Sequence, residues 1–404
     1  MAKRGDHTRV LIYSHDSFGL GHLRRCRAIA HALVEAHKDM SVLILSGSPI
    51  IGSFDFRTRV DFVRVPGVIK RRNGEYTSLN LNIATEDTLA MRASILEHTA
   101  EIFDPDLFLV DKEPLGLRGE VRGTLEMLKA RGTPLVLGLR DVMDGPELLA
   151  PEWQRKNAMP ALVDLYDAIW VYGLPQICDP LEGLEVPVAV RAKMRYTGYL
   201  RRGVPQAGPA PPQPFDRPYV LVTPGGGGDG DQLVDWVLGA YEADRALPHP
   251  ALIVLGPFMQ LERQRRFKER AEALDDVAVL TFDTQPEKLM ADAIGVVAMG
   301  GYNTFCEILS FDRRAILVPR ARPRLEQTIR AERAQALGLV SMLRGGGRRD
   351  PRRMAAALRS LEGQPRPSEV VVPGLLDGLD RVNHLLDDLI AGPPAATLAE
   401  RRRA

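Results

Sequence analysis

Two glycine-rich loops, each between an apolar run and a predicted helix, carry residue types that bind phosphate and move protons. The second loop holds Gly225 to Gly228, after the apolar run 219–223 and before the predicted helix 231–246. Glycines let backbone N–H groups approach a phosphate because no Cβ intervenes, and a helix N-terminus adds about half a positive charge. Four consecutive glycines exceed the needs of a tight turn. The spacing is not G-x-x-x-x-G-K-[ST], so we predict a phosphate site that is not a P-loop.

The first loop, Gly19-Leu20-Gly21-His22, follows the apolar run 10–13. Arg24-Arg25 stands where the third glycine of the dinucleotide fingerprint would fall, so a nicotinamide dinucleotide site is disfavoured. An imidazole has a reference pKa of about 6.5, so at pH 7 it is largely neutral and can accept a proton. We therefore predict His22 as a general base, with His15 as the competing histidine. The alternative is that His22 only hydrogen-bonds the loop.

A third glycine pair, Gly300-Gly301, follows the apolar run 295–299. Asn303 or Thr304 is expected to cap the next helix and to lie at a nucleotide. Glu307 follows near the same helix start, where a carboxylate can accept hydrogen bonds from two ribose hydroxyls. The alternative for Glu307 is a glutamate that only stabilises the helix dipole.

Two further charged clusters are weaker signals. The arginines of Arg320-Ala-Arg322-Pro-Arg324 follow the apolar run 315–319, where cations suit a diphosphate, although a solvated basic loop explains them equally well. Two Asp-x-Asp triplets, Asp104-Pro-Asp106 and Asp229-Gly-Asp231, are predicted to be a turn before a strand and a helix cap. Neither is placed as a metal pair should be, so we predict no metal site and no cofactor.

Short apolar runs must position these loops. Runs of this kind suit strands that are buried on both faces, and hence parallel sheets. Helical stretches alternate with them, at 22–37 and 231–246 for example, which predicts doubly wound α/β layers. The predicted strands are 10–13, 42–45, 61–65, 107–110, 135–139, 168–172, 219–223, 251–255, 277–281, 295–299 and 315–319.

A proline-rich segment divides the chain into two halves. Residues 201–216 contain many prolines, which suit neither helix nor sheet interiors, so we predict a linker there. Each half then begins with a strand that enters a glycine-rich turn. We expect two Rossmann-like doubly wound domains that face a cleft, at 1–200 and 217–390, and a flexible tail at 391–404.

Composition excludes several classes of protein. The 404 residues are 45% hydrophobic and 26% charged, which is typical of globular chains. Lys and Arg total 53 against 52 for Asp and Glu, so we expect no nucleic-acid partner that binds through bulk charge. The three cysteines form no CxxC pair, which favours a reducing compartment. No secretory leader or membrane-spanning run is apparent, so a cytoplasmic protein is expected.

The order of these features resembles the GT-B glycosyltransferases, and within them it is most similar to glycosyltransferase family 28. That family includes the N-acetylglucosaminyltransferase that makes the lipid-linked peptidoglycan precursor. The resemblance is best over 217–345 and thinner over the first 40 residues and at 196–199. It implies that Gly19, Gly21 and His22 form a loop that faces the acceptor and the donor diphosphate.

The resemblance also implies a set of donor-binding positions. Tyr196-Thr-Gly-Tyr199 is similar to the turn that closes the first domain. The implied donor contacts are the phosphate loop Gly225 to Gly228, Phe282 (within 280–290) at the base, Gly300, Gly301 and Glu307 at the ribose, and Glu326 and Gln327 at the donor sugar.

The resemblance implies a metal-independent, inverting glycosyltransferase that uses a nucleotide-sugar donor, expected to be a UDP-sugar, and an unidentified hydroxyl acceptor. Inversion is favoured because Met299 replaces the first glutamate of the Glu-x7-Glu pattern of retaining GT-B enzymes. Asp111 and Asp141 remain alternative bases. A nucleotide-sugar hydrolase, a 2-epimerase and a non-catalytic nucleotide-sugar-binding protein remain alternative functions.

The acceptor side departs from the family. Residues 66–72 have no clear counterpart there, and Val68-Ile-Lys-Arg-Arg72 sets apolar residues beside cations. Such a run suits an anionic membrane surface, although a solvated loop is the commoner meaning. A lipid-linked or cell-envelope polysaccharide precursor as acceptor, and peripheral contact with the inner face of a membrane, therefore stay open.

Overall fold

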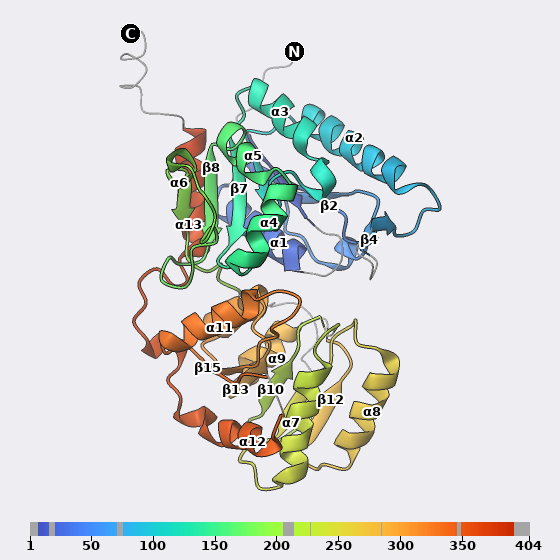
Figure 1. The fold of residues 1–404 in the computed structure, drawn as a ribbon, viewed down its shortest axis with the longest axis vertical. Helices are drawn as coiled ribbons and strands as arrows, with labels where there is room; N and C mark the ends of the chain where they lie inside the picture. The colour runs from blue at the N-terminus through green and yellow to red at the C-terminus, as the bar shows by residue number, and fades with distance from the viewer. Residues whose placement is uncertain are drawn as a thin grey trace. The chain divides into compact units, whose positions relative to one another are not determined.

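The computed structural model describes residues 7–15, 21–70, 76–204, 214–226, 228–283, 285–345 and 349–391 (Figure 1). These residues form two compact units. Unit 1 takes those within Met1–Pro175, Pro180–Leu200 and Asp377–Ala404, and unit 2 takes those within Gln176–Asp179 and Arg201–Leu376. Each unit is an α/β structure around its own parallel sheet, as predicted.

The sheet of unit 1 has seven strands in the order β3-β2-β1-β6-β7-β8-β9, and each neighbouring pair is parallel. Its strands are β1 (Thr8–Ser14), β2 (Met40–Ser46), β3 (Val60–Arg64), β6 (Leu107–Asp111), β7 (Leu135–Arg140), β8 (Ala168–Tyr172) and β9 (Met194–Tyr196). An antiparallel hairpin joins β4 (Val68–Lys70) to β5 (Tyr76–Ser78). The helices are α1 (Gly21–Ala36), α2 (Thr85–Phe103), α3 (Arg122–Ala130), α4 (Pro146–Arg155), α5 (Ala158–Asp164), α6 (Val188–Arg191) and α13 (Gly378–Ile390).

Unit 2 contains a six-stranded parallel sheet in the order β12-β11-β10-β13-β14-β15. Its strands are β10 (Val220–Thr223), β11 (Ala251–Val254), β12 (Val277–Leu280), β13 (Gly295–Ala298), β14 (Arg314–Leu317) and β15 (Ser341–Met342). Its helices are α7 (Asp231–Ala243), α8 (Leu261–Glu272), α9 (Pro286–Asp292), α10 (Tyr302–Ser310), α11 (Glu326–Ala336) and α12 (Pro351–Ser360).

Burial on both faces explains why the apolar runs form the strands. All residues of β6, β8 and β11 are buried, and so are those of β13. On α1 the buried stripe includes Leu23, Cys26 and Ile29, at the spacing of one helix face. All eleven predicted strands are present, within one or two residues at most ends.

The strand order reverses direction at one point in each sheet. In unit 1, β1 lies between β2 and β6, and in unit 2, β10 lies between β11 and β13. Ligands of doubly wound sheets bind outside the carboxyl ends of the strands at such a switch point. The loops that follow β1, β6, β10 and β13 are therefore where a site is expected.

The C-terminal helix is where the domain boundaries differ from the prediction. Residues from Asp377 onwards group with unit 1, although the prediction assigned everything up to 390 to the second domain. In unit 1, α13 packs against α1, and the Gly378 N–H donates to the Tyr199 carbonyl at 3.2 Å. The predicted linker and tail lie largely outside the described residues.

Candidate active site

His22 and Asp111 meet at the switch point of unit 1. His22 is the second residue of α1, which follows β1, and Asp111 is the last residue of the neighbouring strand β6. His22 Nδ1 lies 2.5 Å from Asp111 Oδ2. A separation this short requires a proton between the two atoms, so Nδ1–H donates to the carboxylate. The neutral ring then has an unprotonated Nε2, which is the atom that a general base needs.

Burial and charge keep this pair in the state that base catalysis needs. Burial lowers the pKa of His22, and the opposing attraction of Asp111 does not restore it. Burial opposes the charge of Asp111, but Arg25 and His22 outweigh it and hold the pKa of that carboxyl below its ordinary range. The His22 side chain is 21% exposed and that of Asp111 only 1%. The imidazole is therefore neutral at pH 7 and open to a ligand on one side.

The alternative bases are less suitable. Asp141 is fully buried, and its Oδ2 accepts from the Tyr199 hydroxyl at 2.7 Å, so the structure gives it a packing role rather than that of a base. Asp111 serves as the partner of His22. The His15 ring centre lies 5.6 Å from that of His22, and burial lowers the pKa of His15 to about 3.

The predicted phosphate loop of unit 2, Gly225 to Gly228, begins just after β10 ends. Gly225 has a φ of +79°, a conformation that favours glycine, and its N–H donates to Thr223 Oγ1 at 3.2 Å. The Gly226 carbonyl accepts from the Phe258 N–H at 3.0 Å, which ties the loop to the segment after β11. Gly226 and Gly228 are exposed. Gly227 lies outside the described residues, as does Gly19 of the first loop.

The third glycine pair follows β13, at the same switch point as the phosphate loop. Gly300 has a φ of +78°, and its carbonyl accepts from Arg330 Nη1 at 2.9 Å. Gly301 caps α10, so the prediction that Asn303 or Thr304 caps it is wrong. Both are helical residues, and Asn303 Oδ1 accepts from Arg202 Nη2 at 2.9 Å. The Gly301 carbonyl accepts the first hydrogen bond of the helix, from the Phe305 N–H at 2.9 Å.

Glu307 lies further along α10, in its second turn rather than its first. Only 3% of the residue is exposed. Stabilisation of the helix dipole does not explain it, because that effect falls off within the first turn. Its position on the helix that follows Gly301 keeps it a candidate for the ribose.

Arg320 joins the phosphate loop to the two predicted sugar-contacting residues. Its guanidinium bonds Asp229, which closes the phosphate loop, and Oε1 of Glu326 at 2.7 Å. Its backbone N–H donates to Gln327 Oε1 at 3.2 Å. Glu326 and Gln327 begin α11 and are both buried. Asp229 therefore pairs with Arg320 and does not cap α7, whose N-cap is Gly230.

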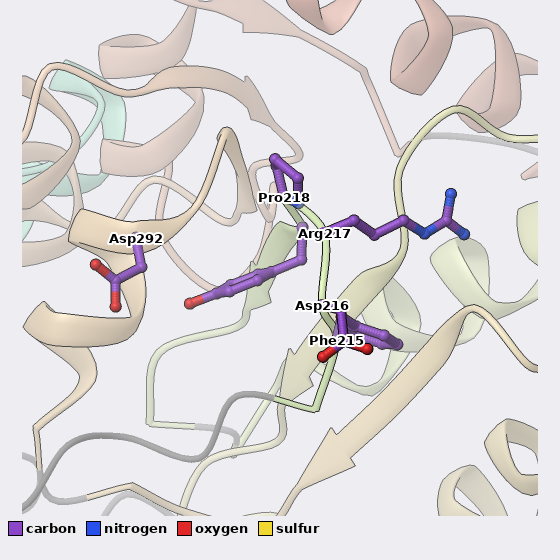
Figure 2. A pocket seen from close by; sticks show the side chains of 6 residues that line it. Phe215, Asp216, Arg217, Pro218 and Asp292 are labelled. Atoms are coloured by element: carbon purple, nitrogen blue, oxygen red, sulfur yellow. The ribbon is translucent and has the colours of Figure 1, made fainter.

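Phe282, the predicted base contact, makes none of the hydrogen bonds described above. Phe282 follows β12 and is 50% exposed, so its ring is free to stack on a planar group. A cavity of about 450 Å³, lined by Phe215 to Tyr219 and by Asp292, lies before β10 and at the end of α9 (Figure 2). That is the amino edge of the sheet, opposite the phosphate loop, and no predicted site residue lines the cavity.

The predicted membrane-facing run is only partly available. Val68 belongs to β4 and is completely buried, so it packs inside unit 1 and offers no apolar surface to a membrane. Arg71 and Arg72 lie outside the described residues. Among the helices that the structure describes, none is long and apolar enough to span a membrane.

Comparisons with known proteins identify the fold. Residues 220–361 match the glycosyltransferase family 28 C-terminal domain. No curated protein sequence matches the chain significantly. Among solved structures, UGT71G1 of Medicago truncatula, complexed with UDP-glucose, is 16% identical with a TM-score of 0.61, and the match covers 96% of this chain and 100% of that one.

Two further solved structures extend the likeness. MurG of Acinetobacter baumannii is 15% identical with a TM-score of 0.56, over 94% of this chain and 98% of that one. The glycosyltransferase VinC, in complex with dTDP, is 17% identical with a TM-score of 0.55, over 98% of this chain and 99% of that one. The chain therefore has the GT-B fold and is similar to family 28, and the comparisons support a glycosyltransferase.

Proposed function

We propose that this protein transfers a sugar from a nucleoside-diphosphate sugar, expected to be a UDP-sugar, to a hydroxyl acceptor with inversion at the anomeric carbon and without a metal ion. The observation that carries the proposal is the His22–Asp111 pair at the switch point of unit 1. The family match over residues 220–361 supports it on the donor side.

Unit 2 would bind the donor. The diphosphate would meet backbone N–H groups of Gly225 to Gly228, which offset the charge that builds on the leaving group. Each well-placed donor of this kind is worth about 3 kcal/mol in the transition state. The ring of Phe282 would stack on the base and the carboxylate of Glu307 would accept from the ribose hydroxyls. Arg320 already holds the phosphate loop beside Glu326, and it would add a charge-assisted contact to a phosphate oxygen.

The acceptor would react beside His22. Nε2 takes the proton of the acceptor hydroxyl while its oxygen forms a bond to the anomeric carbon. The bond from that carbon to the diphosphate breaks, and its electron pair leaves with the diphosphate. Asp111 stabilises the imidazolium that forms, because its carboxylate already holds Nδ1–H. Attack opposite the leaving group inverts the configuration.

A donor panel tests the proposal. Nucleoside diphosphates that bind the native state raise its apparent stability, so a thermal-shift screen with UDP-, dTDP- and GDP-sugars identifies the donor. The preferred donor is then incubated with and without hydroxyl acceptors. Transfer that depends on an acceptor supports the proposal. Free sugar without an acceptor indicates a hydrolase, an isomerised sugar indicates an epimerase, and binding without turnover indicates a binding protein.

Replacement of Glu307 by alanine is expected to weaken nucleoside-diphosphate binding about tenfold or more, because two hydroxyl-to-carboxylate hydrogen bonds are lost. Isothermal calorimetry measures the dissociation constant. Glu332→Gln is the matched control, since Glu332 is an exposed carboxylate of unit 2 that pairs with Arg344. An unchanged affinity in a folded Glu307→Ala variant would remove Glu307 from the ribose site.

A further inference from the structure

Arg25 is a buried cation directly behind the catalytic pair. It lies one turn after His22 on the same face of α1, and its side chain is 2% exposed. Its Nε donates to Asp111 Oδ1 at 2.8 Å and its Nη2 donates to Asp111 Oδ2 at 2.7 Å. Nη2 also lies 3.1 Å from His22 Nδ1. The guanidinium therefore grips both carboxylate oxygens while His22 uses the second of them.

We propose that Arg25 is a positioning residue that holds Asp111 ionised and oriented so that its Oδ2 accepts the Nδ1 proton of His22. The inference rests on the proposed function, in which His22 Nε2 is the base. It also gives a role to the arginine that stands where a dinucleotide-binding loop would have its third glycine.

Geometry explains why an arginine is suited to this place. A carboxylate at the end of a strand can rotate about its side-chain bonds, and a single hydrogen bond to His22 leaves that rotation open. The planar fork of a guanidinium fixes both oxygens at once, which a lysine, with a point charge, does not do. A buried carboxylate also needs a cation to offset its loss of hydration.

The charge of Arg25 acts on His22 as well. Among the residues that the structure describes, the groups that face the pair are Arg25 on α1, Lys112 after β6, His15 after β1 and the Tyr172 hydroxyl on β8. Burial is the main cause of the lowered pKa of His22, and Arg25 and Lys112 lower it further, against Asp111. Without Arg25, Asp111 would stabilise the imidazolium with less competition. The pKa of His22 would then rise, and less neutral base would be present at pH 7.

Three variants test the proposal. Arg25→Gln removes the positive charge, and Arg25→Lys keeps the charge but loses the two-pronged guanidinium contact with the carboxylate. Arg27→Gln is the control, because Arg27 lies on the same helix but its guanidinium donates to the Asp55 carbonyl. NMR titration of the His22 ring, assigned with a His22→Gln variant, reports its pKa without any need for turnover. The pH profile of kcat/KM with the preferred donor is measured in parallel.

In Arg25→Gln we expect the His22 titration and the acid limb of kcat/KM to move up by about one to two pH units. In Arg25→Lys we expect the titration to stay near that of the wild type while kcat falls about tenfold or more. If Arg25→Gln does not fold, the Arg25→Lys comparison alone decides. The proposal would be overturned if the His22 titration and the pH profile of kcat/KM were the same in the Arg25 variants as in the wild type and in Arg27→Gln. A wild type that turns over no donor counts against the proposed function only, since the NMR titration still tests Arg25.

Discussion

His22→Ala is expected to reduce sugar transfer by about 10²–10⁴-fold while the affinity for nucleoside diphosphate stays within about twofold of the wild type. The rate falls because the other described candidates at this switch point are poorer bases. His15 is neutral but its pKa of about 3 makes it a weak base, and Asp141 is fully buried. The affinity is retained because the proposed donor contacts belong to unit 2, whereas His22 belongs to unit 1.

Initial rates with saturating donor and calorimetry with the nucleoside diphosphate measure the two quantities. Asp111→Asn is the informative companion, because it keeps the shape of the side chain but removes the charge that stabilises the imidazolium. We expect its loss to approach that of His22→Ala. Turnover that survives in a folded His22→Ala variant would exclude His22 as the base and return the question to the alternative bases Asp111 and Asp141.

The pH dependence of the wild type follows from the same pair. A base acts only when it is deprotonated, so kcat/KM should fall about tenfold per pH unit below the pKa of His22. Burial lowers that pKa below the ordinary value of about 6.5, so the acid limb should lie below pH 6.5. A limb above pH 7 in the wild type would contradict the described environment of His22.

Local sequence was sufficient to predict the framework. Continuous apolar runs such as Leu107-Phe-Leu-Val110 predicted buried parallel strands because both faces of each strand are covered. Glycine loops after β1, β10 and β13 predicted the edge of each sheet at which a ligand is expected, because parallel strands place their carboxyl ends at one edge. Strands of three residues, such as β4 and β5, carry too few apolar positions to be recognised, and the structure adds them.

Pairings between distant residues could not be predicted. Asp111 is 89 residues from His22, and Asp229 is 91 residues from Arg320, so neither contact leaves a periodic signal in the sequence. The available hint was weaker: an aspartate that directly ends a buried strand next to the switch point. The prediction placed α13 in the second domain because α13 follows unit 2 in the sequence. In the structure α13 packs on α1 of unit 1.

Replacement of Gly256 is expected to have a second large effect on ligand binding, because Gly256 packs directly against the predicted phosphate loop. It follows β11, has a φ of +91°, and donates its N–H to the Thr281 carbonyl at 3.0 Å. A Cβ on Gly256 would lie 2.5 Å from the Gly225 carbonyl oxygen and 2.8 Å from the Gly226 carbonyl carbon. Both are backbone atoms that cannot rotate away, so the loop itself would have to move.

Gly256→Ala is therefore expected to weaken nucleoside-diphosphate binding about tenfold or more and to leave the affinity for the corresponding nucleoside nearly unchanged. In the proposed function the displaced N–H groups contact only the phosphates, so the loss should appear only when phosphates are present. Gly338→Ala is the matched control, since Gly338 has a φ of +78° in the same unit and its nearest atom, in Val370, lies 3.9 Å from the added Cβ. Both variants carry the backbone strain of about 1–2 kcal/mol that a positive φ imposes, and thermal unfolding checks that both are folded. Equal diphosphate affinities in the two variants would mean that the loop beside Gly256 does not bind the diphosphate.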